Sequence, residues 1–166
     1  MKYTYAVKVI ATQGNVKNVE GLLQEKPLQI GLNEPNLCEM QGKSYIILDF
    51  GKELSGGARI LTYYARGNAT VRLRFGESVG EVCAELKDGE EGYGATNDHS
   101  LRDFTMELRN YSDMTFGQTG FRFLRIDTLG EDSAVGLKGV VAAVDTDTFS
   151  SLMSDTFPTS NKCLCS

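Results

Sequence analysis

Long apolar runs, a secretion signal and clustered basic residues are all absent from this chain of 166 residues. No stretch approaches the roughly 20 apolar residues that a helix needs to cross a bilayer. The start, MKYTYAVKVIATQG, lacks the apolar run of a signal peptide. The 17 Lys and Arg residues alternate along strand-like segments, against 22 Asp and Glu, and form no basic patch. We therefore expect neither a membrane nor a nucleic acid as a partner.

Cysteine is too sparse and too irregular to organise the fold. The four residues are Cys38, Cys83, Cys163 and Cys165. Their spacing matches neither a disulfide framework nor the paired C-x-x-C of a zinc site. We predict free thiols, with the last two exposed in a polar tail and prone to oxidation.

A sustained helical period is also missing, and the two-residue period of half-buried strands takes its place. The clearest case is 70–76, where every second residue is apolar and where we expect Arg72 and Arg74 to face water. The turn residues before it predict that 58–76 forms a hairpin. Near the N-terminus, 3–9 alternates in the same way. The predicted core comprises Val71, Leu73, Phe75, Phe104, Met106, Leu108 and Phe121.

Only one segment, 18–25, suggests a helix, and Gly21 and Pro27 limit it to a turn or two. A parallel α/β fold is therefore excluded, because its crossovers need helices. Eighteen glycines, most of them between strand segments, supply tight corners. With about eight strands, the chain is predicted to be all-β, an antiparallel β-sandwich or jelly roll.

Three motifs carry a family resemblance. They are YIILDFGKELSGGAR (Tyr45–Arg59), GATNDHSLRD (Gly94–Asp103) and TGFRFLRID (Thr119–Asp127). In this order they resemble the β-sandwich domain that precedes the catalytic barrel in bacterial α-L-rhamnosidases of glycoside hydrolase family 78. The resemblance covers roughly 44–147.

The resemblance implies a galactose-binding-domain-like sandwich at 1–147. It implies that 148–166 is a truncated linker or tail, which loosely echoes the segment leading to the first barrel helix, and that the catalytic α/α barrel is missing. It also implies a periplasmic or secreted parent enzyme; with no signal peptide in the chain, the sequence leaves the compartment open.

Three functions from different classes follow. The first is a non-catalytic accessory module of an α-L-rhamnosidase, whose partner is the catalytic domain of the parent enzyme. The second is an autonomous carbohydrate-binding module for plant-type or bacterial glycans. The absence of tryptophan counts against it, although Tyr93, Tyr111 and Phe116 could partly replace that platform. The third is a small enzyme, but the sequence offers no nucleophile–base pair, metal constellation or phosphate loop. We expect no catalytic residue and no activity from this chain alone.

The candidate binding residues lie in the long segment before the strand that begins near Asp103. They are Asn97, Asp98, His99 and Arg102. Amide and carboxyl groups hydrogen-bond to vicinal hydroxyls, and carboxylates are ligands for calcium, so sugar contact and a calcium site both fit. A structural role is our preferred interpretation. Asn97 and Asp98 would then cap a turn, and Arg102 would pair with Asp103 or Asp98. We expect no obligatory cofactor.

Asp49 and Glu53 suggest a carboxylate pair, but we favour a structural role for Asp49, which follows a buried strand and can accept backbone amides of the 51–55 turn. For Arg122 and Arg125 we expect stems that cover the sheet and guanidinium groups that pair with acids.

Overall fold

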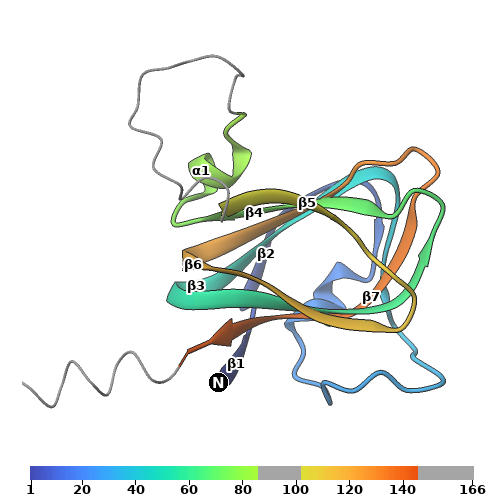
Figure 1. The fold of residues 1–166 in the computed structure, drawn as a ribbon, viewed down its shortest axis with the longest axis horizontal. Coiled ribbons are helices and arrows are strands. Elements are labelled where there is room, and N and C mark those ends of the chain that lie inside the picture. Colours follow the sequence, from blue (N-terminus) through green and yellow to red (C-terminus); the bar gives the residue numbers. More distant parts are fainter. Residues whose placement is uncertain (86–101, 146–166) are drawn as a thin grey trace, which may run out of the picture.

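The computed structural model describes residues 1–85 and 102–145 and is almost entirely β (Figure 1). Its helices are short: a 3₁₀ turn, η1, and a single turn of α-helix, α1. The elements in chain order are β1 (Lys2–Tyr5), β2 (Lys8–Lys17), η1 (Val19–Leu23), β3 (Cys38–Arg66), β4 (Thr70–Gly76), α1 (Val79–Cys83), β5 (Asp103–Glu107), β6 (Ser112–Thr128) and β7 (Ala134–Val144). No helix among these is long and apolar enough to span a membrane.

Every strand pairing is antiparallel, and two long strands, β3 and β6, pass through both layers of the fold. We call the first layer the β4 layer; it contains β2, residues 38–49 of β3, residues 123–128 of β6, β4 and β5. The second, the β7 layer, contains β1, β7, residues 54–66 of β3 and residues 112–121 of β6. Figure 1 shows β4 and β5 on one side of the molecule and β1 and β7 on the other. The predicted sandwich is therefore confirmed, with its layers joined into one continuous sheet.

Strand β3 passes from one layer to the other just after residues 48–51, Leu-Asp-Phe-Gly. The pairing of β3 with β6 shifts between Asp49 and Leu54. Gly51 adopts a left-handed conformation there, with φ 77°, and its amide donates to Asp49 Oδ1 at 2.7 Å. Farther along, a Cβ at Gly56 would collide with the carbonyl oxygen of Ala143 on β7. Only glycine allows β3 to bend and still lie against β7.

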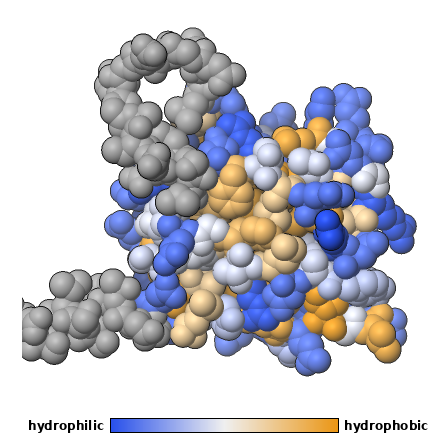
Figure 2. Space-filling view, viewed as in Figure 1, coloured by the Kyte–Doolittle hydropathy of each residue, from blue (hydrophilic) through white to orange (hydrophobic). Residues whose placement is uncertain are grey.

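The core between the layers contains most of the residues that the alternation predicts. Five of the seven predicted core residues are buried, and the other two, Phe104 and Met106, are half-buried against the same core cluster. The rings of Phe50 and Phe75 both pack edge-on against Phe121, at 5.6 and 5.0 Å between centroids. On the side seen in Figure 2, apolar residues are visible between the layers and hydrophilic residues surround them.

Two predictions about strand pairing and exposure are wrong. The segment 58–76 is not a hairpin, because β4 pairs with β5 and β6, and its turn carries the chain from one layer to the other. The N-terminal alternation does not continue through 3–9 either. The strand breaks after Tyr5, so that Ala6 is buried and Val7 is 63% exposed. The weak helical signal at 18–25 is confirmed as η1.

The cysteine prediction is confirmed where the structure describes it. Cys38 and Cys83 are free thiols, the first buried and the second exposed. Burial raises the pKa of the Cys38 thiol to about 12, so this group is inert. Cys163 and Cys165 lie outside the described residues.

A segment without strands, residues 24–36, lies over the outer face of the β7 layer; we call it the strap. Its backbone carbonyls accept hydrogen bonds from side chains of the sheet. The Tyr5 hydroxyl donates to Lys26 O at 2.6 Å, and the Tyr63 hydroxyl donates to Leu32 O at 2.6 Å. Arg59 donates to Leu28 O at 3.2 Å, and Lys138 donates to Gln29 O.

Charge fixes the strap as well. Lys138 Nζ lies 2.6 Å from the Glu34 carboxylate, and their side chains are 9% and 12% exposed. The hydrogen bond from Lys138 holds the pKa of Glu34 below its usual value. This face of the sandwich is thus closed by the chain itself.

Candidate functional site

Three of the four predicted binding residues, Asn97, Asp98 and His99, lie outside the described residues, so sugar contact and calcium at that segment stay predictions. Arg102, the fourth, is described and lies directly before β5. Its Nε donates to Thr119 Oγ1 at 3.1 Å, and its guanidinium lies 3.5 Å from Glu77 and 3.8 Å from Glu81.

The predicted pair between Arg102 and Asp103 is not formed, because the two side chains have other partners. Asp103 pairs instead with Arg72 on β4, at 2.6 Å. Arg102 thus ties the start of β5 to β6 and to the region of α1. Asp98, the other predicted partner of Arg102, lies outside the described residues. No group of three or more His, Cys, Asp or Glu that could hold a metal is found within 1–85 and 102–145.

The outer face of the β4 layer carries the most extensive polar arrangement that the structure describes. Strand register aligns two rows of side chains across five strands, because alternate residues of each strand point to the same face. The first row is Gln13, Tyr45, Asp127, Arg72 and Thr105. The second row is Ala11, Ile47, Arg125, Arg74 and Asp103.

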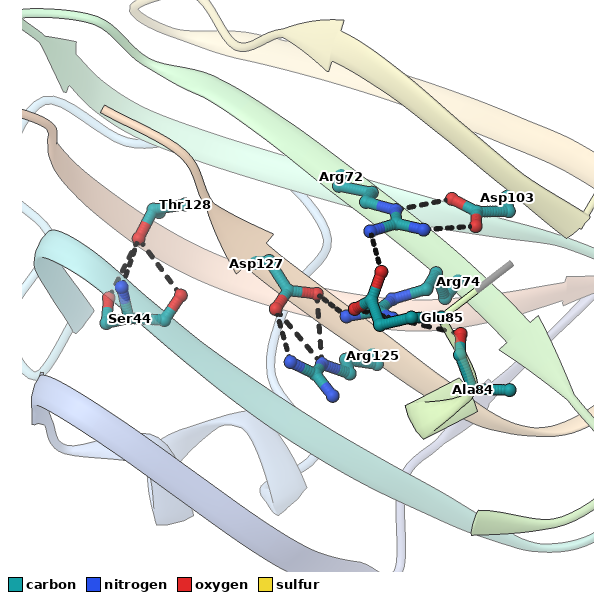
Figure 3. Close-up of polar contacts among 9 residues, drawn as sticks. All are labelled: Ser44, Arg72, Arg74, Ala84, Glu85, Asp103, Arg125, Asp127 and Thr128. Carbon is teal, nitrogen blue, oxygen red and sulfur yellow. Dashed lines mark hydrogen bonds and ion pairs between the residues drawn. The ribbon is translucent and has the colours of Figure 1, made fainter. Parts of the chain in front are cut away.

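Arginine–carboxylate pairs connect the two rows (Figure 3). Arg74 and Arg125 hold Asp127 from opposite sides, at 3.0 and 2.7 Å. Arg72 makes a bidentate pair with Asp103, at 2.7 and 2.6 Å. Fixed forks of this kind are the strong form of a charged hydrogen bond.

Glu85, just beyond α1, bridges the two arginines of β4. Its carboxylate lies 3.1 Å from Arg72 and 2.9 Å from Arg74. These hydrogen bonds, the one from Arg72 foremost, hold the pKa of Glu85 below its usual value. Glu85 itself is exposed.

The prediction that Arg72 and Arg74 face water is only partly right for Arg72 and is wrong for Arg74. Arg72 is half-buried, and Arg74 is only 3% exposed. The Nε of Arg74 is buried and has no partner among the residues that the structure describes, while its other nitrogens bind Asp127, Glu85 and the carbonyl oxygen of Ala84. Asp127 of β6 and Glu85, just beyond α1, bind the guanidinium of Arg74 in place of the water that strand alternation alone would predict.

Helix α1 covers one end of this outer face. Ser78 caps it, with its hydroxyl accepting from the Glu81 amide at 3.2 Å. Val82 is fully buried and packs on Ile47 and Phe123, in a small cluster separate from the main core. The end of the face near β2 is left open.

At that open end lies a shallow hollow of about 260 Å³. Its lining is Gln13, Lys43, Ser44, Tyr45, Asp127, Thr128 and Leu129. Ser44 and Thr128 bind each other, with 2.9 Å between their hydroxyl oxygens (Figure 3). The Thr128 hydroxyl also donates to the Gly42 carbonyl oxygen at 2.6 Å. The guanidinium of Arg125 lies over the ring of Tyr45, 4.0 Å from its centroid.

The interpretations of Asp49, Arg122 and Arg125 are confirmed. Asp49 is buried, accepts the Gly51 amide and receives both nitrogens of the Arg122 fork at 2.9 and 3.0 Å. The hydrogen bond from Arg122 holds the pKa of Asp49 below its usual value. Arg122 also lies over the ring of Phe123, at 5.0 Å.

The aromatic residues suggested as sugar platforms differ in their burial and packing. Phe116 is half-buried against the core, with its ring centroid 6.5 Å from that of Phe104. Tyr111 is 64% exposed, has a left-handed backbone with φ 52°, and packs edge-on against Tyr63 at 5.2 Å. Tyr93 lies outside the described residues.

The sequence matches no family model and no curated protein. Solved structures do match. A rhamnosidase from Klebsiella oxytoca with rhamnose bound superposes with a TM-score of 0.59 and 15% identity, over 86% of this chain and 28% of that one. This chain therefore spans little more than a quarter of that enzyme.

Two further structures match almost along their whole length. The family 32 carbohydrate-binding module of AlyQ, in complex with 4,5-unsaturated mannuronic acid, has a TM-score of 0.52 and 14% identity, over 86% of this chain and 98% of that one. Reduced XRCC1, bound to the catalytic domain of DNA polymerase β, has a TM-score of 0.56 and 14% identity, over 87% and 99%. At such identities these likenesses show the fold alone: a galactose-binding-like jelly roll.

Proposed function

We propose that the chain is a non-catalytic accessory β-sandwich module of an α-L-rhamnosidase, which supports a catalytic α/α barrel. One observation carries the proposal: the same fold occupies 28% of a solved rhamnosidase, so a sandwich of this kind forms one part of a larger enzyme there. The three sequence motifs point to the same family.

The acids of the described surface support a non-catalytic role. Glycosidases use two carboxyl groups, one of them free to act as acid or base. Here Asp49, Asp103 and Asp127 are each held by one or two arginines. Hydrogen bonds from the guanidinium groups occupy the oxygens of these carboxylates, so they are not free to act as acid or base.

Hydrolysis of an aryl α-L-rhamnoside tests the non-catalytic part. The purified chain should give no turnover above buffer, and turnover that survives repurification would overturn it. The codons that follow Ser166 in the gene test the accessory part. An in-frame α/α barrel supports it, and an unrelated domain contradicts it.

The alternative is an autonomous carbohydrate-binding module. It is favoured by the match that covers 98% of the AlyQ module, since that module is a complete binding unit of the same fold. The predicted residues Asn97, Asp98, His99 and Arg102, with calcium as a possible ligand, belong to this hypothesis.

Melting curves of the parent and of Asp98→Ala, with and without about 5 mM CaCl₂ or L-rhamnose, compare the two roles. We expect Asp98→Ala to lower stability by about 0.5 to 2 kcal/mol irrespective of ligand, as the loss of a cap or ion pair does. A ligand-dependent rise confined to the parent would favour the carbohydrate-binding module.

A further inference from the structure

The hollow at the β2 end of the β4 layer has a floor that is already built. Ser44 and Thr128 are almost fully buried, and their hydroxyl groups and the Gly42 carbonyl satisfy one another. The floor therefore needs no ligand to complete it, and its shape is set before anything binds.

The rim, by contrast, offers polar groups without a fixed partner. In the part of the chain that the structure describes, neither the Gln13 amide nor the Tyr45 hydroxyl hydrogen-bonds to a protein group across the hollow. Lys43 is held only by Glu131, at 3.0 Å. Both side chains are mostly exposed, so replacing this ion pair with a contact to a ligand costs little free energy. An amide, a phenol and an ammonium group together supply donors and acceptors for several hydroxyls.

The charges around the hollow balance. Lys43 and Asp127 line the hollow. Together with their partners and the rest of the ion pairs on this face they amount to four cations and four acids: Lys43, Arg72, Arg74 and Arg125 with Glu85, Asp103, Asp127 and Glu131. Each acid is already paired with at least one of these cations. The surface therefore offers no excess charge to attract an anionic ligand, and a neutral, hydroxylated ligand fits it better.

The apolar wall and the volume of the hollow restrict the kind of ligand further. Leu129 is 39% exposed at the wall, and the Tyr45 ring is held in place by the Arg125 guanidinium. A sugar ring presents apolar C–H groups beside its hydroxyls and so matches a wall of this kind. Sites for drug-sized ligands enclose roughly 300 to 1,000 Å³. About 260 Å³ suits a smaller ligand of one ring.

We propose that this hollow binds a single neutral sugar ring of a glycan, with Gln13, Tyr45 and Lys43 contacting its hydroxyls. The inference goes beyond the supporting role proposed above and does not depend on it. Of the predicted residues Asn97, Asp98, His99 and Arg102, only Arg102 is described, and it does not line the hollow. The inference therefore rests on residues other than the predicted set.

Titration of the ¹⁵N-labelled chain with methyl α-L-rhamnoside, methyl β-D-galactoside and methyl β-D-glucoside tests the proposal, with sodium glucuronate as the anionic probe. We expect saturable shifts at residues 13, 43–45 and 127–129 with at least one neutral glycoside. Tyr45→Phe and Gln13→Ala each remove one hydrogen-bonding group and should weaken that binding about 3- to 10-fold.

Tyr3→Phe is the matched control, because it removes the hydroxyl of an exposed tyrosine that does not line the hollow, and it should bind like the parent. Melting curves verify that all variants are folded. Lack of saturable shifts, equal binding by Tyr45→Phe and the parent, or tighter binding of glucuronate would each overturn the inference. None of these outcomes would alter the hydrolysis assay or the codons after Ser166, so the two proposals fail separately.

Discussion

The outer face of the β7 layer is covered by the strap. On the outer face of the β4 layer, by contrast, charged side chains of the sheet form ion pairs with one another. On the first face, sheet side chains point outward and donate to carbonyls of residues 26–32. On the second, arginines bind acids of the same strand or of a neighbouring strand within the plane of the face. A face that pairs its charges in its own plane needs no cover, and it can keep an open hollow for a ligand.

The largest expected effect is a loss of stability that does not distinguish the two faces, because both layers share one core. Leu73→Ala removes a fully buried side chain from β4 and should lower the free energy of unfolding by about 2 to 5 kcal/mol. Urea unfolding followed by circular dichroism measures it. Leu32→Ala, on the strap and 90% exposed, is the control and should change stability by less than about 0.5 kcal/mol. A similar cost for both variants would place Leu73 outside the core.

The second effect is specific to the closed face. Lys138→Met leaves the carboxylate of Glu34 buried and removes the donor to Gln29 O, so we expect a loss of about 3 kcal/mol. Lys43→Met, on the open face, removes an exposed pair and should cost about 0 to 1 kcal/mol. The difference between these two lysines, measured by urea unfolding, is a direct test of the contrast between the faces. Equal costs would mean that the strap contributes no more than an ordinary surface pair.

Local sequence patterns predict strands well here because the two-residue period depends only on which side is buried. Val71, Leu73 and Phe75 are buried as expected, and the corner at Asp49 forms because Gly51 and Gly56 permit conformations and contacts that other residues do not. Local patterns do not indicate which strands pair with each other. The turn before β4 shows that the chain reverses, but the strands that flank β4 are β5 and β6, both later in the sequence.

The polar face could not be predicted for the same reason. Alternation indicates that Arg74 points away from the core, but not that Asp127, 53 residues later, meets it there. The hollow is likewise lined from three separate stretches of chain, around Gln13, Tyr45 and Asp127. Only Arg102 among the predicted binding residues can be compared with the structure. Its partners, Glu77 and Glu81, come from an earlier stretch of chain that no local pattern connects to it.

A smaller effect concerns the open face. Arg74→Met should lower the free energy of unfolding by about 1 to 2 kcal/mol, less than for Lys138→Met, because Asp127 keeps its pair with Arg125. Arg109→Met, at an exposed position after β5, is the control and should leave the unfolding midpoint nearly unchanged. A more stable Arg74→Met protein would show that desolvation of this arginine outweighs its ion pairs.

The smallest effect is a difference in acid sensitivity between the two faces. The carboxyls of Glu34 and Glu85 both have a pKa lowered by hydrogen bonds, the first from Lys138 and the second from Arg72 and Arg74. A lowered pKa in the folded state contributes stability above the unfolded value of about 4.3, and this contribution is lost as pH falls through the folded pKa. Stability should therefore decline from about pH 5 downward.

Glu34→Gln should flatten that decline more than Glu85→Gln, because the Glu34 side chain is 12% exposed and the Glu85 side chain is 66% exposed and screened by solvent. For Glu85→Gln we expect a loss of about 0 to 1 kcal/mol at neutral pH. Urea unfolding at pH 7, 5, 4 and 3 gives both slopes. A steeper dependence on Glu85 than on Glu34 would reverse the comparison, because it would make the pairs of the open face, and not the strap, the main acid-sensitive support of the fold.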